Sequence, residues 1–262
     1  MSAAGTPHGT ADRAALEAEV RRLVAEAEAV GAPMRVLGTL GVSIHCPATA
    51  QLLRSFKRTY SDIDLAAYRR NAREVTRVLA ASGYVEDRQL AIDSEGRRGL
   101  YDHPSNGTHV DVFFDVLEFC HPIVLAGRLE RDSPTLPVAD LLLSKLQIVK
   151  INEKDVIDAI LLILEHPIID GSADPDALDG RRIARACAAE WGLWRTLTLN
   201  LDKVVALART YEQLTDEQRA TVESRVGELL EWLDLEPKPL AWRVRAKVGE
   251  RRQWWTDVEE VR

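Results

Sequence analysis

Acidic residues recur at strand-like spacing in two short segments of the chain, in a pattern suited to a metal site. Asp62 and Asp64 stand two residues apart in SDIDLAA, where polar and apolar residues alternate, so both carboxylates project from one face of the predicted strand. In HVDVFFDV, the clearest strand of the sequence, Asp111 shares a face with His109 and Asp115, opposite an apolar face. If the two strands are neighbours, the carboxylates of Asp62, Asp64 and Asp111 can converge on one spot.

Three carboxylates held close together repel one another and raise each other's pKa unless a cation lies among them. Hard oxygen ligands, without thiols or paired histidines, favour Mg²⁺ or Mn²⁺ over zinc. Two such ions held by shared aspartates suit in-line phosphoryl or nucleotidyl transfer, because one activates the attacking hydroxyl and the other neutralises the leaving pyrophosphate. An Asp-x-Asp pair is also a common pattern of an exposed edge strand. Its place after a glycine turn and before a second acidic strand favours the catalytic interpretation.

The runs LGTLGVSIH, SDIDL and HVDVFFD, in this order, resemble the nucleotidyltransferase superfamily, whose fold is typified by the palm of polymerase beta-type enzymes. The resemblance implies that Gly38 and Thr39 form a turn that approaches the nucleotide phosphates. It also implies that Asp62 and Asp64 bind the metal ions and that Asp111 is the third acid. Thr39 departs from the usual Gly or Ser, although its hydroxyl can replace that of serine. The interval before Asp62 is also longer than in the commonest version of this pattern.

A lysine and two aspartates follow in the second half of the chain. Lys145 lies on the apolar stripe of a helix predicted over 138–150, where an unpaired charge is costly. Asp155 and Asp158 lie one turn apart in the next predicted helix. Two interpretations stay open: a buried lysine–aspartate ion pair that fixes the angle between two helices, or a site in which Lys145 reaches the nucleotide phosphates and Asp155 orients it or helps to position the substrate.

The strings ADLLLSKLQ and NEKDVIDAI resemble the region that follows the catalytic strands in AbiE-type toxin nucleotidyltransferases. In that group, which acts in abortive-infection and toxin–antitoxin systems, a lysine and a downstream aspartate belong to the active site. The resemblance therefore implies active-site roles for Lys145 and Asp155. Some relatives add nucleotides to the 3′ end of tRNA. The implied partners are an NTP donor, an acceptor that is tRNA or another RNA, and a cognate antitoxin.

Two further features have both a binding and a structural interpretation. Ser61 directly precedes Asp62, where it can hydrogen-bond a phosphate or simply serve the turn. The stretch from Lys238 to Arg252 carries six basic residues against one acid and is accompanied by tryptophans. Basic residues interleaved with aromatic ones can hold phosphates and stack bases. A terminal helix docked by its tryptophans, with a solvated basic face, is the other interpretation. The tryptophans concerned are Trp242, Trp254 and Trp255.

The elements that must position these residues fall into two parts. A disordered leader is predicted over 1–10, followed by a small mixed-sheet nucleotidyltransferase domain over 11–132. After a proline-bearing linker, with the boundary near Pro134–Pro137, no strand is predicted and an all-helical domain spans 138–262. The predicted fold class is therefore α+β. The predicted strands are 34–37, 62–67, 88–93, 98–102 and 109–116, and the predicted helices are 11–29, 70–81, 138–150, 153–165, 176–191, 193–209, 216–235 and 240–255.

Composition narrows the setting. The 262 residues carry a formal net charge of −7, so a nucleic-acid contact needs a local basic patch. Three scattered cysteines show neither zinc nor disulfide spacing, which fits a reducing, cytoplasmic location. No targeting segment is evident in the first ten residues, and the longest apolar run is far shorter than the roughly 20 residues of a membrane span. We therefore expect a cytoplasmic protein with no membrane partner.

Together these patterns predict a Mg²⁺- or Mn²⁺-dependent transferase that moves a nucleoside monophosphate from an NTP to an acceptor hydroxyl and releases pyrophosphate. The acceptor stays open between an RNA 3′ end, a protein hydroxyl and a small molecule such as an aminoglycoside or lincosamide antibiotic. A non-catalytic nucleotide-binding or partner-binding protein of the same fold is an alternative. A structural protein in which the acidic pattern is coincidental is another. The predicted nucleotide-binding residues are Gly38, Thr39, Ser61 and Lys145.

Overall fold

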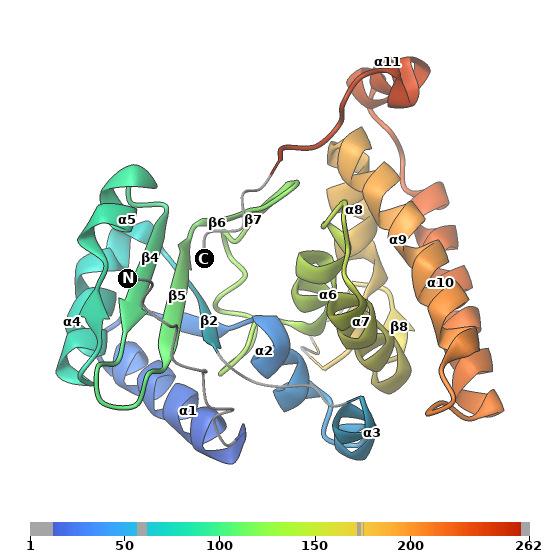
Figure 1. Ribbon diagram of the computed structural model, residues 1–262. Helices are drawn as coiled ribbons and strands as arrows, with labels where there is room; N and C mark the ends of the chain where they lie inside the picture. The colour runs from blue at the N-terminus through green and yellow to red at the C-terminus, as the bar shows by residue number, and fades with distance from the viewer. Residues whose placement is uncertain (1–12, 57–61, 172–173, 175, 258–262) are drawn as a thin grey trace, which may run out of the picture.

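The computed structural model describes residues 13–56, 62–171, 174 and 176–257, and the predicted leader lies outside these ranges. The described chain forms a mixed sheet with flanking helices, beside a bundle of helices (Figure 1). The elements of the first part are α1 (Arg13–Ala29), β1 (Met34–Val36), α2 (Gly38–His45), α3 (Ala50–Ser55), β2 (Asp62–Ala67), a 3₁₀ turn (Arg69–Asn71), α4 (Ala72–Ala81), β3 (Val85–Glu86), α5 (Arg88–Asp93), β4 (Arg98–Asp102), β5 (His109–Phe114), β6 (Val116–Glu118) and β7 (Pro122–Val124).

The main sheet has five strands in the order β1-β2-β5-β4-β3. Its central pair, β2 and β5, runs parallel, and the remaining pairs are antiparallel. The two acidic strands are therefore direct neighbours, and their register sets Asp64 opposite Asp111. This mixed sheet, followed by helices, confirms the predicted α+β class.

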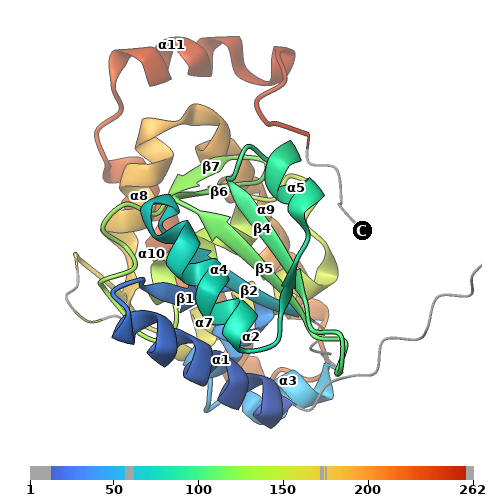
Figure 2. The same ribbon diagram turned by 90° about the vertical axis from the view of Figure 1, so that its left-hand side faces the viewer.

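One face of the sheet is apolar and covered by two helices. Ile63 and Leu65 of β2 and Val110 and Val112 of β5 are fully buried there. They pack against the apolar sides of α1 and α4, which lie across this face (Figure 2). Because side chains alternate along a strand, burying these four residues turns the intervening aspartates to the opposite face. The hydrophobic pattern thus fixes where the carboxylates point.

The second part is mainly helical and shares a core with the first. Its larger apolar cluster joins α6, α7, α8, α9 and α10 to residues of α2, α3 and β7. The segment at the expected boundary is hydrogen-bonded to the sheet edge, since the Val36 amide donates to Pro134 O and the Leu136 amide to Val36 O. The elements are α6 (Val138–Leu146), α7 (Glu153–Glu165), β8 (Ile168–Ile169), β9 (Leu178–Asp179), α8 (Gly180–Ala189), α9 (Trp191–Thr210), α10 (Asp216–Leu235), α11 (Leu240–Val248) and a 3₁₀ turn (Gly249–Arg251).

Several sequence predictions were wrong in detail. The strand predicted over 109–116 ends at Phe114, the helix predicted over 138–150 ends at Leu146, and the helix predicted over 176–191 begins only at Gly180. The segment 88–93 is helix α5 and not a strand, because the Asp87 carboxylate caps its N-terminus by accepting from the Gln89 and Leu90 amides. Two short strands, β8 and β9, lie among the helices of the second part, where none was predicted. Helix α11 ends at Val248 and not near 255, because Gly249 adopts a positive φ of 60° that stops the helix.

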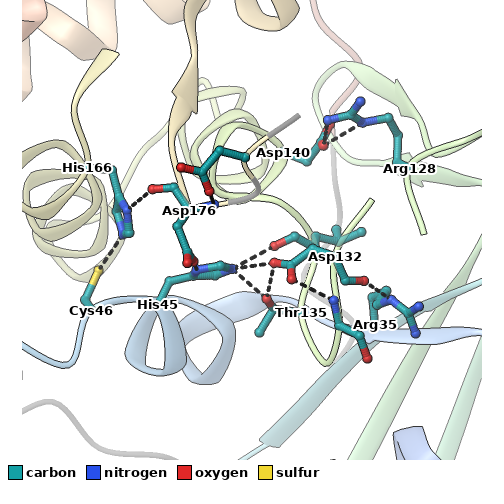
Figure 3. A network of polar contacts seen from close by, with 12 residues as sticks. Arg35, His45, Cys46, Arg128, Asp132, Thr135, Asp140, His166 and Asp176 are labelled. Atoms are coloured by element: carbon teal, nitrogen blue, oxygen red, sulfur yellow. Dashed lines mark hydrogen bonds and ion pairs between the residues drawn. The ribbon is translucent and has the colours of Figure 1, made fainter. Parts of the chain in front are cut away.

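A buried polar network ties α2 to the loop before α6 (Figure 3). His45 Nε2 lies 2.9 Å from Asp132 Oδ2, and His45 Nδ1 lies 3.2 Å from Asp176 Oδ1. Burial by itself lowers the pKa of His45, but its carboxylate neighbours outweigh burial and raise the pKa above the ordinary value. Burial raises the pKa of Asp132, but the hydrogen bond and charge of His45 lower it overall. The pair is therefore stabilised in its charged form.

The helices of the described ranges differ in length and in apolar character. None of them combines the length and the apolar character that a membrane crossing requires.

Candidate active site

The acidic face of the central strand pair is the centre of the candidate site. Asp64, on β2, is partly buried and stands opposite Asp111 of β5, which is buried. Asp62 is the exposed first residue of β2, two positions away on the same face, and pairs in register with His109. The sheet thus gathers the three aspartates that the sequence singled out.

The pKa of Asp64 reflects its closeness to the other two aspartates. Burial raises its pKa first, and the negative charges of Asp111 and Asp62 raise it further, to about 6. The positive charges of Lys145 and Arg98 act in the opposite direction. An additional cation among these carboxylates would relieve the remaining repulsion.

Gly38 lets the Asp64 carboxylate lie against the backbone at the start of α2. A β-carbon at position 38 would stand 2.0 Å from Asp64 Oδ2, and Gly38 has a φ of 65° that side-chain-bearing residues rarely adopt. The Leu37 amide donates to the Asp64 carbonyl at 3.0 Å, which ties the turn to β2. A residue other than glycine would displace the carboxylate, so the sequence of this turn is dictated by the site.

The N-terminus of α2 faces the same region. Amides in the first turn of a helix have no partner within that helix and favour an anion such as a phosphate. The Thr39 hydroxyl is turned to the helical part, where it donates to Asp158 Oδ2 at 3.0 Å. The contribution of Thr39 to phosphate binding is therefore expected from its backbone, while its side chain links α2 to α7.

Lys145 stands on α6 between two aspartates of α7. Its Nζ lies 2.8 Å from Asp155 Oδ1 and 3.0 Å from Asp158 Oδ2, and the Asp158 side chain has no exposed surface. Burial by itself lowers the pKa of Lys145, but the two carboxylates outweigh it and raise the pKa above the ordinary value. The lysine therefore stays protonated, and α6 and α7 are joined by the ion pair that the sequence allowed for.

The two arrangements meet in one hollow of about 170 Å³. Gly38 and Asp64 line it from the sheet part, and Lys145 and Asp155 line it from the helical part. Its apolar walls include Phe113 and Phe119, whose ring centroids are 5.1 Å apart, together with Leu37 and Ile148. The structural and catalytic interpretations of Lys145 are thus compatible, because the ion pair itself forms a wall of the hollow.

Arg98, which no sequence pattern singled out, engages the third aspartate. Its Nε lies 2.8 Å from Asp111 Oδ1 and 2.9 Å from Oδ2, and its Nη2 also contacts Oδ2. The antiparallel register pairs Arg98 with Phe113, the next residue on the acidic face of β5, so the guanidinium reaches Asp111 diagonally. The available signal was an arginine at the start of a predicted strand, but its partner depends on the strand order.

The donor set fits a hard divalent cation, because three carboxylates of adjacent strands share one face and the pKa of Asp64 is raised by its neighbours. Within the described ranges, however, no three acidic, histidine or cysteine side chains are already grouped as a set of metal ligands. Asp111 is engaged by Arg98 instead. Ser61, the remaining predicted contact of the nucleotide, lies outside the described residues.

Comparisons with known proteins add little to this geometry. No protein-family model matches the sequence, and no match was found among curated proteins. Among solved structures, the chain is similar to the solution structure of the antibiotic-resistance factor ANT(2'')-Ia, with a TM-score of 0.39 and 13% sequence identity. That alignment covers 84% of this chain and 97% of the other. The side chains of the hollow therefore remain the main guide to function.

Proposed function

We propose that this chain is a Mg²⁺-dependent nucleotidyltransferase that uses an NTP as donor. The observation that supports it most is the meeting, at one hollow, of three features from separate elements. These are the paired acidic strands, a glycine that brings Asp64 against the start of a helix, and a buried lysine held by two aspartates. A core-building sheet requires none of these features. Together they provide carboxylates for a cation, and a helix N-terminus and a lysine for phosphates.

In the proposed reaction, the acceptor hydroxyl oxygen forms a bond to the α-phosphorus of the NTP. The bond between that phosphorus and the bridging oxygen breaks, pyrophosphate leaves, and the hydroxyl proton passes to solvent. Mg²⁺, when bound, supplies neutralisation of the phosphate oxygens and activation of the hydroxyl. Asp62 and Asp64 are the residues that we expect to hold it, with Asp111 joining once Arg98 releases it. Mn²⁺ is expected to replace Mg²⁺ at these oxygen ligands.

The remaining residues position the nucleotide. The backbone amides at Gly38 and Thr39 lie at the positive end of α2, where they can donate to the terminal phosphates. Lys145 contributes positive charge to the wall of the same hollow, and Asp155 fixes its orientation through the 2.8 Å contact. The charge of Lys145 is shared with two carboxylates, so we assign it a role in balancing and positioning.

A binding measurement tests the proposal without knowledge of the acceptor. Each of the four NTPs, in a form with a non-hydrolysable α–β linkage, is titrated into the protein with Mg²⁺ and with EDTA, by calorimetry. We expect binding of at least one nucleotide that depends on Mg²⁺ and is lost when Asp62 and Asp64 are both replaced by asparagine. Binding that is as strong with EDTA as with Mg²⁺, and as strong in the double variant as in the intact protein, would contradict the proposed site.

A further inference from the structure

The last described residues cross from the helical part back to the sheet part. After α11 the chain turns at Gly249 and returns toward β6 and β7 (Figure 1). Here the Thr256 amide donates to the Cys120 carbonyl at 3.1 Å. The Trp254 indole donates to Thr196 Oγ1 of α9 at 3.0 Å, so the same segment is held by both parts. We call residues 249–257 the C-terminal strap.

A hollow of about 440 Å³ lies against this strap, within the size range of sites for small molecules and cofactors. Its lining combines Trp254 and Trp255 with the arginines Arg245 and Arg252, and Glu190 is the one acid among its described lining residues. A combination of flat aromatic rings and guanidinium groups is typical of sites that bind single-stranded nucleic acids, since bases stack on the rings and phosphates pair with the arginines.

Contacts within the chain hold the aromatic rings in place. The ring centroids of Trp254 and Trp255 are 4.7 Å apart in an edge-to-face arrangement. The ring centroids of Trp254 and Trp191 are 6.1 Å apart, also edge to face. The Trp255 indole donates to Asp257 Oδ1 at 3.0 Å and remains partly exposed. A base that stacks on Trp255 therefore meets a ring whose orientation is already fixed, which lowers the entropic cost of binding.

The charges of the hollow favour an anionic ligand. Arg245 lies 4.4 Å from the centroid of the Trp191 ring and donates to the Gly249 and Arg252 carbonyls, so it shapes the strap. Arg252 is exposed at the rim, where its guanidinium can reach a phosphate. The carboxylate of Glu190 lies 2.9 Å from His121 Nδ1. A cationic acceptor would meet two arginines here.

The hollow is adjacent to the candidate active site. Phe119 lines the active-site hollow, and the next two residues, Cys120 and His121, line the hollow at the strap. On the helical side, Ile148 lines the active-site hollow and the amide of its neighbour Val149 donates to Cys120 Sγ at 3.4 Å. The two hollows are thus lined by consecutive residues of the same segment of chain.

We propose that the hollow at the C-terminal strap binds the terminal nucleotides of a single-stranded RNA and directs its 3′ hydroxyl into the active-site hollow as the acceptor. This inference rests on the proposed nucleotidyl transfer for its chemistry, but the binding site stands on its own residues. It also gives a role to the basic, tryptophan-rich segment near the end of the sequence.

Binding of RNA tests the site directly. The probe is a fluorescein-labelled single-stranded RNA of about eight nucleotides, with its label at the 5′ end, measured by anisotropy. We expect Trp255→Ala to weaken binding about tenfold, because a stacking platform is lost, and Arg252→Ala to weaken it and reduce its dependence on salt. Trp255→Phe should retain most of the affinity. Arg251→Ala is the matched control, because it removes the same charge one position outside the lining.

Four outcomes are informative. Loss of RNA binding in Trp255→Ala and Arg252→Ala, with normal melting temperatures and intact Mg²⁺-dependent NTP binding, supports the inference. Equal weakening by Arg251→Ala overturns it, because binding then depends on charge alone. Unchanged RNA binding in all three variants also overturns it, while NTP binding and transfer still stand. Failure of NTP binding in the intact protein, with RNA binding that needs Trp255, would reject the proposed function and leave the RNA site.

Discussion

Arg98 holds Asp111 with a bifurcated hydrogen bond from its Nε, at 2.8 and 2.9 Å to the two carboxylate oxygens, and with a further contact from Nη2. An internal cation thus neutralises one of the three aspartates on the acidic face. The guanidinium also lies 5.2 Å from the centroid of the Phe113 ring, which restricts its position. The pKa of Arg98 is raised, first by the hydrogen bonds to Asp111 and against the effect of burial. A divalent cation that binds at the proposed site would therefore compete with Arg98 for this carboxylate.

We predict that Arg98→Ala raises the affinity for Mn²⁺ about threefold to tenfold, because the carboxylate no longer has to leave an ion pair. Titration of Mn²⁺, followed by electron paramagnetic resonance of the free ion, measures this affinity without a turnover assay. Arg97→Ala, next to it on the chain, is the control. An affinity that falls or stays constant in Arg98→Ala would show that Arg98 does not oppose the cation.

The start of α2 supplies a second test. Gly38→Ala should disturb the Asp64 carboxylate, since the new β-carbon would lie 2.0 Å from Oδ2. Gly31→Ala is a close control, because Gly31 also has a positive φ, of 74°, yet nothing in the described chain lies within 4 Å of the place that its β-carbon would take. Both variants should lose about 1 kcal/mol of stability from backbone strain. Only Gly38→Ala should lose Mn²⁺ binding, and equal Mn²⁺ binding by the two variants would contradict the close approach.

Lys145 provides a test of the ion pair that joins α6 and α7. Lys145→Met should lower the free energy of unfolding by about 3–5 kcal/mol, because two buried carboxylates lose their partner. Adding Asp155→Asn and Asp158→Asn to Lys145→Met should recover much of this stability, since no uncompensated charge then remains. Urea denaturation measures all three proteins. A triple variant no more stable than Lys145→Met would show that the cost comes from packing and not from charge.

The buried pair of His45 and Asp132 predicts a pH dependence of stability. The pKa of His45 is raised above 6.5 in the folded chain, so its contribution is fully present below 6.5 and is lost as pH rises through the folded value. The pKa of the nearby His166 is lowered, first by burial, so its effect appears only as pH falls below 6.5. Asp176, the other carboxylate on His45, is exposed.

Thermal unfolding from pH 6.5 to about pH 8.5 measures this effect. We expect the melting temperature to fall over this range in the intact protein and to fall less in His45→Gln. His166→Gln should leave this alkaline part of the profile as steep as before. Equal slopes in the intact protein and His45→Gln would mean that the pair is not charged in the folded state.

Local patterns predicted much of the fold. The alternation of Asp62–Ala67 and the periodicity of Asp216–Leu235 gave these elements with the bounds that the structure has, because each pattern is set by one buried face. Helix α5 was missed because its start depends on a single capping residue, Asp87. Capping by one side chain competes with a strand-like composition in so short a segment.

The candidate site was predictable only where its residues follow one strand. Asp62 and Asp64 share a face by geometry alone, whereas their nearness to Asp111 needed the strand order. The contact between Arg98 and Asp111 depends on an antiparallel register, and the contact between Thr39 and Asp158 joins residues 119 positions apart. Such contacts are set by packing between elements, which a single sequence does not display.

Transfer of a labelled nucleotide to RNA tests the claim that this chain is a nucleotidyltransferase. Purified protein is incubated with each α-³²P-labelled NTP, Mg²⁺ and total tRNA, beside the variant with both Asp62→Asn and Asp64→Asn. We predict that label enters RNA with the intact protein, and that it does not with the variant or with EDTA. No labelled product from any NTP, in the presence of RNA, protein or small-molecule acceptors, together with no Mg²⁺-dependent binding of an NTP, would contradict the claim.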